Sequence, residues 1–375
     1  MKKSLMAAAL AALFLVACGK KEEPVAAAPA AAPASTVLNI YNWDDYIPEG
    51  MIAAFEQETG IKVNYDTFDN NETLHAKLIA GNSGYDIVVP TVGFSKKQLE
   101  AGLYQPLDKS KIPNLGNLDP TFMKKLAAID AGNNHYVPWA WGFTTVGINR
   151  QKVAAALGTD QLPANSWELV FNPQYANKLR SCGIIYLDSP TEILPAALHY
   201  IGKDPYSSNP DDIRAAGEML AKVRPSIRLF SSNMIDDIAG GLGCAFIGWS
   251  GDINIAADRV KEQGGKDEVV PLLPSAGGVL FVDVMAIPKD AKNVENAHKF
   301  IDFFLRAESG ASMANEMNYP TANVAATPLI NEEIKNNRTI FLDDENMGRL
   351  IPSGGYPNEL SEVINEVYNA FKRGG

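Results

Sequence analysis

The sequence has few cysteines and histidines and no long apolar run. Of its 375 residues, three are cysteine and four are histidine, and it contains no GxSxG, HExxH, P-loop or complete GxGxxG motif. The apolar stretch at residues 4–17 is too short to span a bilayer. These absences argue against an enzyme with one of those signatures and against a permanent transmembrane helix. We expect no cofactor and no metal.

The overall composition is that of an ordinary globular protein, with 46% hydrophobic and 21% charged residues. The length favours two domains or one large two-lobed unit. The formal charge is −11, and the loss of Lys2 and Lys3 would change it to −13. Such an acidic chain disfavours nucleic acid as a partner and favours cations.

The N-terminus is typical of an exported protein. Residues 1–17 predict a signal peptide, because two lysines precede a compact apolar stretch. Residues 15–19, Leu-Val-Ala-Cys-Gly, resemble a bacterial lipobox, which predicts cleavage before Cys18 and a lipid anchor on its thiol. An ordinary soluble export signal is the alternative. The expected location is the periplasm, with the lipid holding the protein at the cell envelope.

The segment after the lipobox predicts a tether. Residues 18–36 are mostly Ala and Pro and offer nothing to bury, so the folded part is expected to start near Val37. Beyond Cys18, only Cys182 and Cys244 remain. A structural disulfide is their simplest use in an oxidising compartment, and two buried free thiols are the alternative.

The folded part alternates predicted strands and helices, which indicates an α/β fold. The first half begins β-α-β-α-β. Its predicted elements are a strand at 37–41, a helix with Pro48 near its first position and Glu49 in its first turn that stops at Gly60, a strand at 61–65, a helix capped by Asn70 or Asn71 that stops at Gly81, and a strand at 86–89. Later elements are a crossing segment at 138–147, a helix that starts at 209–212, a strand at 279–284 and a helix at 294–305.

Aromatic residues stand beside aspartates in three places, at residues 41–46, 249–252 and 281–283. Each pair is expected in a loop at the end of a strand, where open α/β sheets bind ligands. A buried ammonium needs a carboxylate partner, and an aromatic face adds about 0.5–2 kcal/mol of cation–π attraction while it covers an alkyl chain. The motifs therefore favour a cationic alkyl ligand. The alternative is that the aromatics are core residues and the aspartates are helix caps.

These residues resemble the periplasmic polyamine-binding proteins of bacterial ABC importers, most closely the putrescine-binding type. The resemblance runs from Val37 to the C-terminus, and its specific blocks are residues 40–46, 55–63, 85–90, 105–110 and 247–252. It implies a two-lobed periplasmic-binding-protein fold, type II-like, with a ligand cleft between the lobes and closure by hinge motion. The expected lobes are 37–142 plus about 284–326, and about 143–283 plus 327–375.

The resemblance also implies residue roles. The aromatic walls are Trp43, Trp249, Phe281 and Tyr319; the amine acceptors are Asp45, Glu192, Asp252 and Asp283; Tyr46 and Thr91 complete the ligand-binding set. Glu192 could instead be a helix cap, and Tyr319, which precedes a proline, could simply turn the chain. Cys182 and Cys244 match a disulfide of the putrescine-type members.

Ligand choice follows from four positions. Asp45 and Asp252 are the residues that the putrescine-type proteins have at these positions. Asp44 and Gly93 stand where that type has serines, so one end of the pocket is expected to differ from theirs in charge and in size. Putrescine is the favoured ligand and spermidine the second candidate. Several carboxylates in one cleft are expected to raise each other's pKa values until a cation relieves them.

The expected protein is a monomeric receptor that serves the membrane permease of an ABC importer and is not an enzyme. A glycosidase is the alternative from another class, because paired carboxylates beside tryptophans also suit sugar hydrolysis. A sugar or amino-acid receptor on the same fold would need more amide or arginine side chains than these motifs contain. A lipoprotein that acts as a sensor or adhesin is a further alternative.

Overall fold

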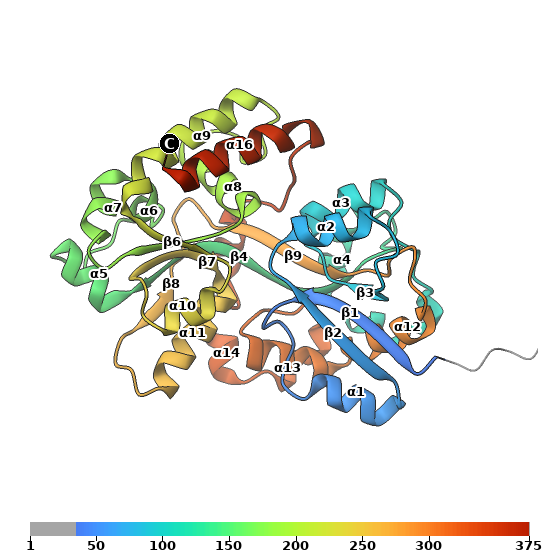
Figure 1. Ribbon diagram of the computed structural model, residues 1–375. Coiled ribbons are helices and arrows are strands. Elements are labelled where there is room, and N and C mark those ends of the chain that lie inside the picture. The colour runs from blue at the N-terminus through green and yellow to red at the C-terminus, as the bar shows by residue number, and fades with distance from the viewer. Residues whose placement is uncertain (1–34, 375) are drawn as a thin grey trace, which may run out of the picture. The chain divides into compact units, whose positions relative to one another are not determined.

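The computed structural model describes residues 35–374, in which the strands form two β-sheets (Figure 1). The first sheet is parallel, with the order β2-β1-β3, and contains β1 (Val37–Trp43), β2 (Lys62–Phe68) and β3 (Ile87–Val88). The helices that follow these strands are α1 (Met51–Thr59), α2 (Asn71–Ile79), α3 (Val92–Glu100) and α4 (Pro120–Leu126). The predicted β-α-β-α-β start, from Val37, is confirmed.

The start of α1 differs from the prediction. Gly50 has φ 78°, a left-handed conformation, so Pro48 and Glu49 precede the helix and α1 begins at Met51. The turn before it is closed by the Met51 amide, which donates to the Pro48 carbonyl. The predicted end is correct, because Gly60 is also left-handed and follows the last helical residue.

Asn70 caps α2, which resolves the choice between the two asparagines. Its side-chain oxygen accepts from the Thr73 amide at 2.7 Å. Asn71 instead donates through its side-chain amide to the Thr91 hydroxyl, 3.1 Å away. Leu74 and Leu78, four residues apart on α2, are buried as the spacing predicts.

The second sheet is mixed, with the order β6-β5-β7-β4-β8 and with β9 paired to β4. Its strands are β4 (Val137–Asn149), β5 (Ile184–Leu187), β6 (Ile227–Ser231), β7 (Ala245–Trp249), β8 (Val269–Pro271) and β9 (Val279–Met285). Every residue of β4 is buried. This strand contains the predicted crossing segment, and β9 contains the predicted strand at 279–284.

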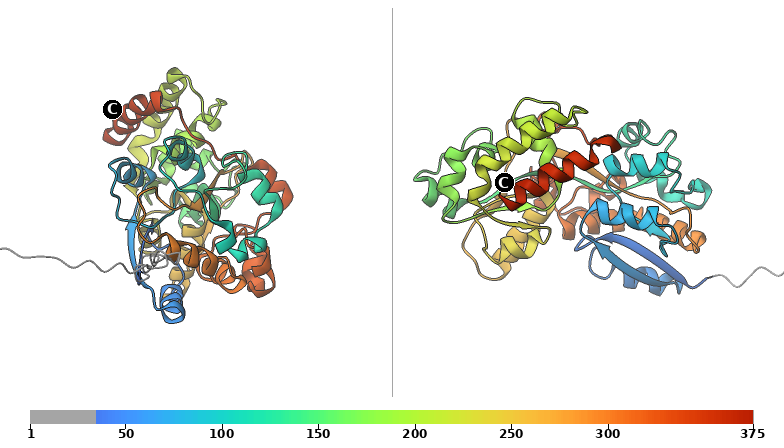
Figure 2. Two further views of the ribbon diagram at one scale, coloured as in Figure 1. Left: turned by 90° about the vertical axis from the view of Figure 1, so that its right-hand side faces the viewer. Right: turned by 45° about the horizontal axis from the view of Figure 1, so that its top comes forward.

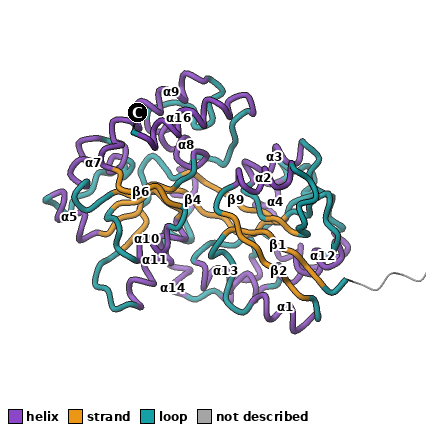
Figure 3. Tube along the Cα trace, viewed as in Figure 1, coloured by secondary structure: helices purple, strands orange, loops and turns teal. Residues whose placement is uncertain are grey.

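Helices surround both sheets, as the purple tubes around the orange strands show in Figure 3. Those between β4 and β8 are α5 (Arg150–Leu157), α6 (Glu168–Phe171), α7 (Pro173–Leu179), α8 (Pro190–Tyr200), α9 (Pro210–Val223), α10 (Met234–Ala239) and α11 (Ser250–Glu262). Those after β9 are α12 (Val294–Phe304), α13 (Ala307–Met317), α14 (Glu332–Asn336), α15 (Asp344–Arg349) and α16 (Ser361–Arg373). Short 3₁₀ helices are η1 (Lys109–Lys111), η2 (Pro113–Asn117), η3 (Arg224–Ser226), η4 (Val324–Leu329) and η5 (Asn358–Leu360).

Two of these helices match the sequence closely. Asn209 caps α9 by accepting from the Asp211 amide at 3.0 Å. The apolar side chains predicted for 294–305 are buried along α12, with Phe300 and Ile301 fully inaccessible. At the end of the chain, α16 lies alongside α9 (Figures 1 and 2), so the C-terminal helix packs on the lobe of the second sheet.

Strands β4 and β9 join the two sheets. They pair antiparallel from Val137 opposite Met285 to Thr144 opposite Val279, with an irregularity between Pro138 and Ala140. Backbone bridges also connect β9 to the region of β3, between Val88 and Ala286 and between Thr91 and Asp283. The first two predicted lobe boundaries, 142/143 and 283/284, fall within this ribbon. All the lobe boundaries stay a prediction.

Cys182 and Cys244 form a disulfide, with their Cα atoms 5.5 Å apart. The disulfide prediction is therefore confirmed, and the alternative of two free thiols is wrong. None of the helices within residues 35–374 is both long and apolar enough to cross a membrane. The predicted signal peptide, the lipidated Cys18 and all but the last two residues of the predicted tether lie outside the described residues.

Candidate functional site

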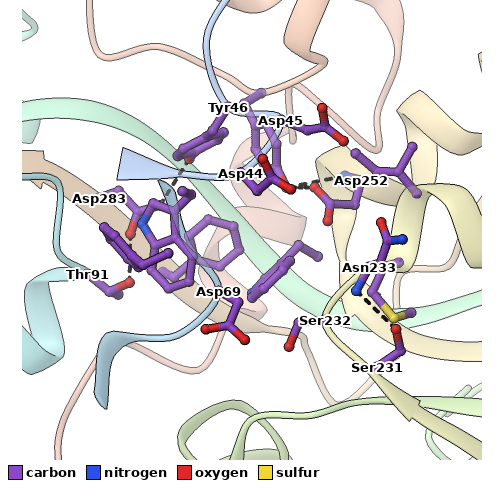
Figure 4. Close-up of a pocket in the computed structure, with 17 residues that line it drawn as sticks. Asp44, Asp45, Tyr46, Asp69, Thr91, Ser231, Ser232, Asn233, Asp252 and Asp283 are labelled. Carbon is purple, nitrogen blue, oxygen red and sulfur yellow. Dashed lines mark hydrogen bonds between the residues drawn. The ribbon is translucent and has the colours of Figure 1, made fainter. Parts of the chain in front are cut away.

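A cavity of about 340 Å³ opens between the two lobes. The first lobe contributes residues that follow β1, β2 and β3, and the second contributes residues from the ends of β6 and β7. Nine of the predicted ligand-binding residues line it: Trp43, Asp45, Tyr46, Thr91, Trp249, Asp252, Phe281, Asp283 and Tyr319. In Figure 4, Asp283 lies at one side with Thr91 and Tyr46, and Asp252 lies at the other.

Asp283 is a buried carboxylate held by two hydroxyl donors. The Tyr46 hydroxyl donates to Oδ2 at 3.0 Å, and the Thr91 hydroxyl donates to Oδ1 at 2.7 Å. Asn71 in turn holds the Thr91 hydroxyl. Burial raises the pKa of Asp283 to about 7, although both hydrogen bonds act to lower it. This carboxylate has neutral partners that orient it and no positive charge that balances it among the groups that shift its pKa.

Asp252 repeats this arrangement on the second lobe. It lies in the first turn of α11, where its Oδ1 accepts from the Tyr319 hydroxyl at 2.6 Å. The same hydroxyl oxygen accepts from the Asp252 amide at 3.2 Å. Burial raises the pKa of Asp252 to about 7, against the Tyr319 hydrogen bond and the weaker attraction of Arg259. Two carboxylates therefore face one cavity from opposite sides.

Aromatic rings cover the space between these carboxylates. The Trp43 indole N–H donates to the Val89 carbonyl at 2.9 Å, which fixes the ring at the end of β1. Its ring centroid lies 5.7 Å from that of Trp249 in an edge-on contact and 4.7 Å from that of Phe68. Apolar ring faces between two carboxylates suit an alkyl chain with an ammonium at each end.

Tyr319 is both a wall and a hydrogen-bond donor. Its ring packs edge-on against Tyr46 at 5.0 Å and against Phe281 at 6.1 Å between centroids. The Tyr319 ring packs directly on the backbone of Gly251. A Cβ atom at residue 251 would overlap the ring, so this contact requires glycine. Tyr319 is thus part of the cavity lining, and the reading that it only turns the chain is wrong.

Asp45 is more exposed than Asp252 and Asp283. Its backbone is left-handed, with φ 48°, and its side chain is 48% exposed. Its Oδ2 lies 3.6 Å from an Arg259 side-chain nitrogen, and Arg259 also pairs with Asp236 at 2.6 Å. Asp45 therefore lines the cavity at its solvent side, next to a protein cation.

The structure does not place Glu192 in the first cavity. Glu192 lies in the first turn of α8 and lines a second cavity of about 110 Å³, which shares Thr91 and Phe281 with the first. Its carboxylate accepts from the Thr144 hydroxyl. Burial raises the pKa of Glu192 to about 7, and Asp283 adds a smaller repulsion. It does not act as a helix N-cap, because it lies inside the helix that Ser189 precedes.

One detail of the sequence-based expectation is wrong, and another is correct but secondary. Phe281 and Asp283 do not lie in a loop at a strand end but inside β9, where the two-residue alternation points both toward the cavity. The expected repulsion between carboxyls is present but secondary: Asp45 acts to raise the pKa of Asp252, and Asp283 acts to raise that of Glu192. Burial is the largest cause for both of these carboxyls and for Asp283. The removal of these carboxyls from water is therefore the main reason for their raised pKa values.

Several lining residues were missed. They are Phe68 and Asp69 at the end of β2, and Ser231, Ser232, Asn233, Met234 and Ile235 at the end of β6 and just beyond it. All lie at or just after the carboxyl ends of strands, so the rule that predicts ligand sites at strand ends could have found them. Asp44 also lines the cavity. The glycine at 93 does not leave free room, because the Gly354 carbonyl occupies the place of its missing Cβ atom.

The arrangement can bind a dication but offers no evident metal site. Within residues 35–374, no group of three or more His, Cys, Asp and Glu side chains is arranged to hold a metal ion. The cavity instead combines flat aromatic cover with two orienting hydroxyl systems around separate carboxylates. This chemistry recognises a short apolar chain with a positive charge near each end.

Comparisons with known proteins agree with this geometry. Residues 50–341 match the family described as bacterial extracellular solute-binding protein. The chain is 45% identical to the putrescine-binding periplasmic protein SpuD of Pseudomonas aeruginosa, over 90% of this chain and 92% of SpuD. It is 43% identical to the putrescine-binding periplasmic protein PotF of Escherichia coli, over 90% of this chain and 91% of PotF. Among solved structures, the spermidine/putrescine ABC transporter substrate-binding protein PotD of Streptococcus pneumoniae matches with a TM-score of 0.72 and 28% identity, over 91% of this chain and 99% of PotD.

Proposed function

Because this chain belongs to the bacterial extracellular solute-binding protein family, we propose that it captures putrescine and delivers it to an ABC transporter, with spermidine as a second ligand. The relatives SpuD and PotF are putrescine-binding periplasmic proteins. The observation that carries the proposal is the pair of carboxylates, the partly buried Asp252 and the buried Asp283, on opposite sides of one aromatic-lined cavity.

The proposed binding set assigns each residue a role. The alkyl chain lies between the aromatic rings, and the two ammonium groups replace water at the carboxylates. The ligand-binding residues are Trp43, Asp45, Tyr46, Thr91, Glu192, Trp249, Asp252, Phe281, Asp283 and Tyr319. A bound dication would also return the raised carboxyl pKa values toward their ordinary range.

We propose binding and not catalysis. A glycosidase also uses a carboxylic acid with a raised pKa, so the pKa values alone do not separate the two functions. A dication makes the same carboxyls ionise, whereas an acid catalyst must keep its proton. The identity of 45% and 43% to putrescine-binding proteins supports the receptor.

Calorimetric titration of the purified, ligand-stripped protein tests the function. We expect putrescine to bind, spermidine to bind more weakly, and maltose not to bind. Spermine tests the upper limit of ligand length. If all three polyamines failed to bind, the proposed function would be wrong.

We further propose that the protein works in the periplasm as a monomer, anchored through a lipid on Cys18 after removal of residues 1–17. This proposal rests on the sequence of the N-terminus. Mass spectrometry of the mature protein should find a diacylglyceryl group on Cys18, and Cys18→Ser should release the protein from membranes. A membrane-free wild-type protein without that mass would contradict the anchor.

A further inference from the structure

The second cavity differs from the first in the charged side chains that line it. It adjoins the first cavity across Thr91 and Phe281, and its charged residues are Glu72, Glu192 and Lys97. Its volume of about 110 Å³ exceeds the roughly 30 Å³ that one water takes up in the liquid, so it has room for a group of several heavy atoms. A ligand longer than a diamine could extend into it from the first cavity.

Lys97 already brings a cation to this space. It lies on α3, half-buried, with its Nζ atom 5.8 Å from the centre of the Phe94 ring. Burial lowers the pKa of Lys97, while Glu359 and Glu72 attract its charge and act to raise the pKa. Reciprocally, Lys97 lowers the pKa of Glu72, which burial raises. The lysine and the acidic wall of this cavity thus offset each other's charge.

We propose that Lys97 determines specificity for diamines over triamines, because its ammonium takes the position of positive charge that a third ligand amine would need. This inference rests on the proposed function and names the ligand length that the same cleft prefers. A diamine that spans Asp252 and Asp283 leaves the second cavity to Lys97. A triamine that passes Thr91 and Phe281 would bring a second ammonium into a small, partly dry space, where like charges repel strongly.

The lining of the second cavity makes charge a better explanation than shape alone. Its C-terminal wall includes Gly354 and Gly355, which carry no side chain into the space. The other C-terminal residues that line it are Ser353, Tyr356, Ser361, Ile364 and Asn365, none of which is charged. The Gly354 carbonyl lies against Gly93, so this wall closes by backbone contact. An uncharged arm would therefore meet less opposition than a charged arm of the same length.

The test compares spermidine with putrescine in wild type, Lys97→Gln and Lys97→Arg. Lys96→Gln is the matched control, because Lys96 is the adjacent, exposed lysine of the same helix and its replacement removes the same charge. We measure both dissociation constants by calorimetry, with competition for the weaker ligand. The ratio Kd(spermidine)/Kd(putrescine) should fall about tenfold in Lys97→Gln, and it should stay within twofold of wild type in Lys97→Arg and Lys96→Gln.

A third ligand separates charge from length. N-butylputrescine has the length of spermidine but ends in a methyl group where spermidine has its terminal amine. We expect wild type to bind N-butylputrescine more tightly than spermidine, and Lys97→Gln to reverse that order. Glu72→Gln is a second variant with the opposite effect, because it leaves Lys97 less balanced and should raise the spermidine/putrescine ratio.

An unchanged ratio in Lys97→Gln would overturn the proposal. Equal weakening or strengthening of both ligands would also overturn it, because Lys97 would then act on the whole cleft. In either case wild-type binding of putrescine would leave the proposed function intact. Wild-type protein that binds neither polyamine would overturn both.

Discussion

The carboxylates that line the two adjoining cavities have different partners. In the first, Asp252 and Asp283 accept hydrogen bonds from tyrosine and threonine hydroxyls. In the second, Glu72 and Glu192 share the space with Lys97. Hydroxyl donors fix a carboxylate in place but carry no positive charge. Arg259 attracts Asp252 only weakly and no cation acts on the pKa of Asp283, so the ligand must supply most of the balancing charge. Where the protein supplies its own cation, a ligand cation contributes less binding free energy, because the carboxylate charge is already partly balanced.

Removal of one carboxylate from each cavity should give the largest contrast. Asp252→Asn keeps a similar shape but leaves one ammonium of a bound diamine unpaired, which costs about 2–5 kcal/mol. We expect calorimetry to show putrescine binding weaker by about 30-fold to several thousand-fold. Glu72→Gln in the second cavity should change putrescine affinity by less than about threefold, or about 0.65 kcal/mol. Similar losses in both variants would mean that the diamine occupies both cavities.

The pH dependence should be the next largest effect. The pKa values of Asp252 and Asp283 are raised to about 7 without ligand, so binding of a diamine at lower pH must expel protons. Below pH 7, the Kd for putrescine should rise by up to about tenfold per pH unit for each carboxyl that must ionise. Asp252→Asn lacks one such group and should show a shallower slope. Equal slopes of Kd against pH in wild type and Asp252→Asn would mean that Asp252 is not one of the carboxyls that ionise on binding.

The same carboxyls affect the stability of the ligand-free protein with the opposite sign. Folding raises their pKa values, so their protonated forms stabilise the fold below the ordinary carboxyl pKa near 4, and this contribution is lost as the pH rises through about 7. Putrescine should therefore raise the melting temperature more at pH 8 than at pH 5. A larger shift at pH 5 would contradict this assignment.

Loss of single hydroxyl donors should give the smallest effects. Tyr319→Phe removes the side-chain donor to Asp252, and we expect putrescine binding to weaken by about 1 kcal/mol, or roughly fivefold. Tyr46→Phe should cost less, because Asp283 keeps the Thr91 hydroxyl. Calorimetry on both variants checks the order. If Tyr46→Phe were the more damaging variant, the Thr91 hydrogen bond would not compensate as the geometry suggests.

Much of the fold could be predicted because local signals and burial agree. The Asn209 cap, the glycine stop at Gly60 and the apolar stripe of α12 each depend on residues close in sequence. The start of α1 could not be predicted in the same way. Pro48 and Glu49 are good first-turn residues, but the left-handed Gly50 excludes them, and sequence alone did not reveal that conformation.

The candidate site could be predicted only where a motif carried it. The aromatic–aspartate pairs at Trp43 and Trp249 line the cavity as expected. The residues after β6 contain serines, an asparagine and apolar side chains, which resemble an ordinary loop. The separation of Glu192 from the first cavity also escaped prediction, because it depends on how Thr91 and Phe281 divide the space. Such long-range packing has no local sequence signal.

The alternation of β9 constrains how this protein can evolve. Phe281 and Asp283 face the cavity, whereas Val282 and Val284 belong to a hydrophobic cluster on the other face. A substitution at either cavity position changes one ligand contact and leaves the strand in place. Insertion or deletion of a single residue would instead exchange the two faces, put valines against the ligand and drive a carboxylate into the core. Ligand preference can therefore drift along this strand by point mutation but not by a change in its length.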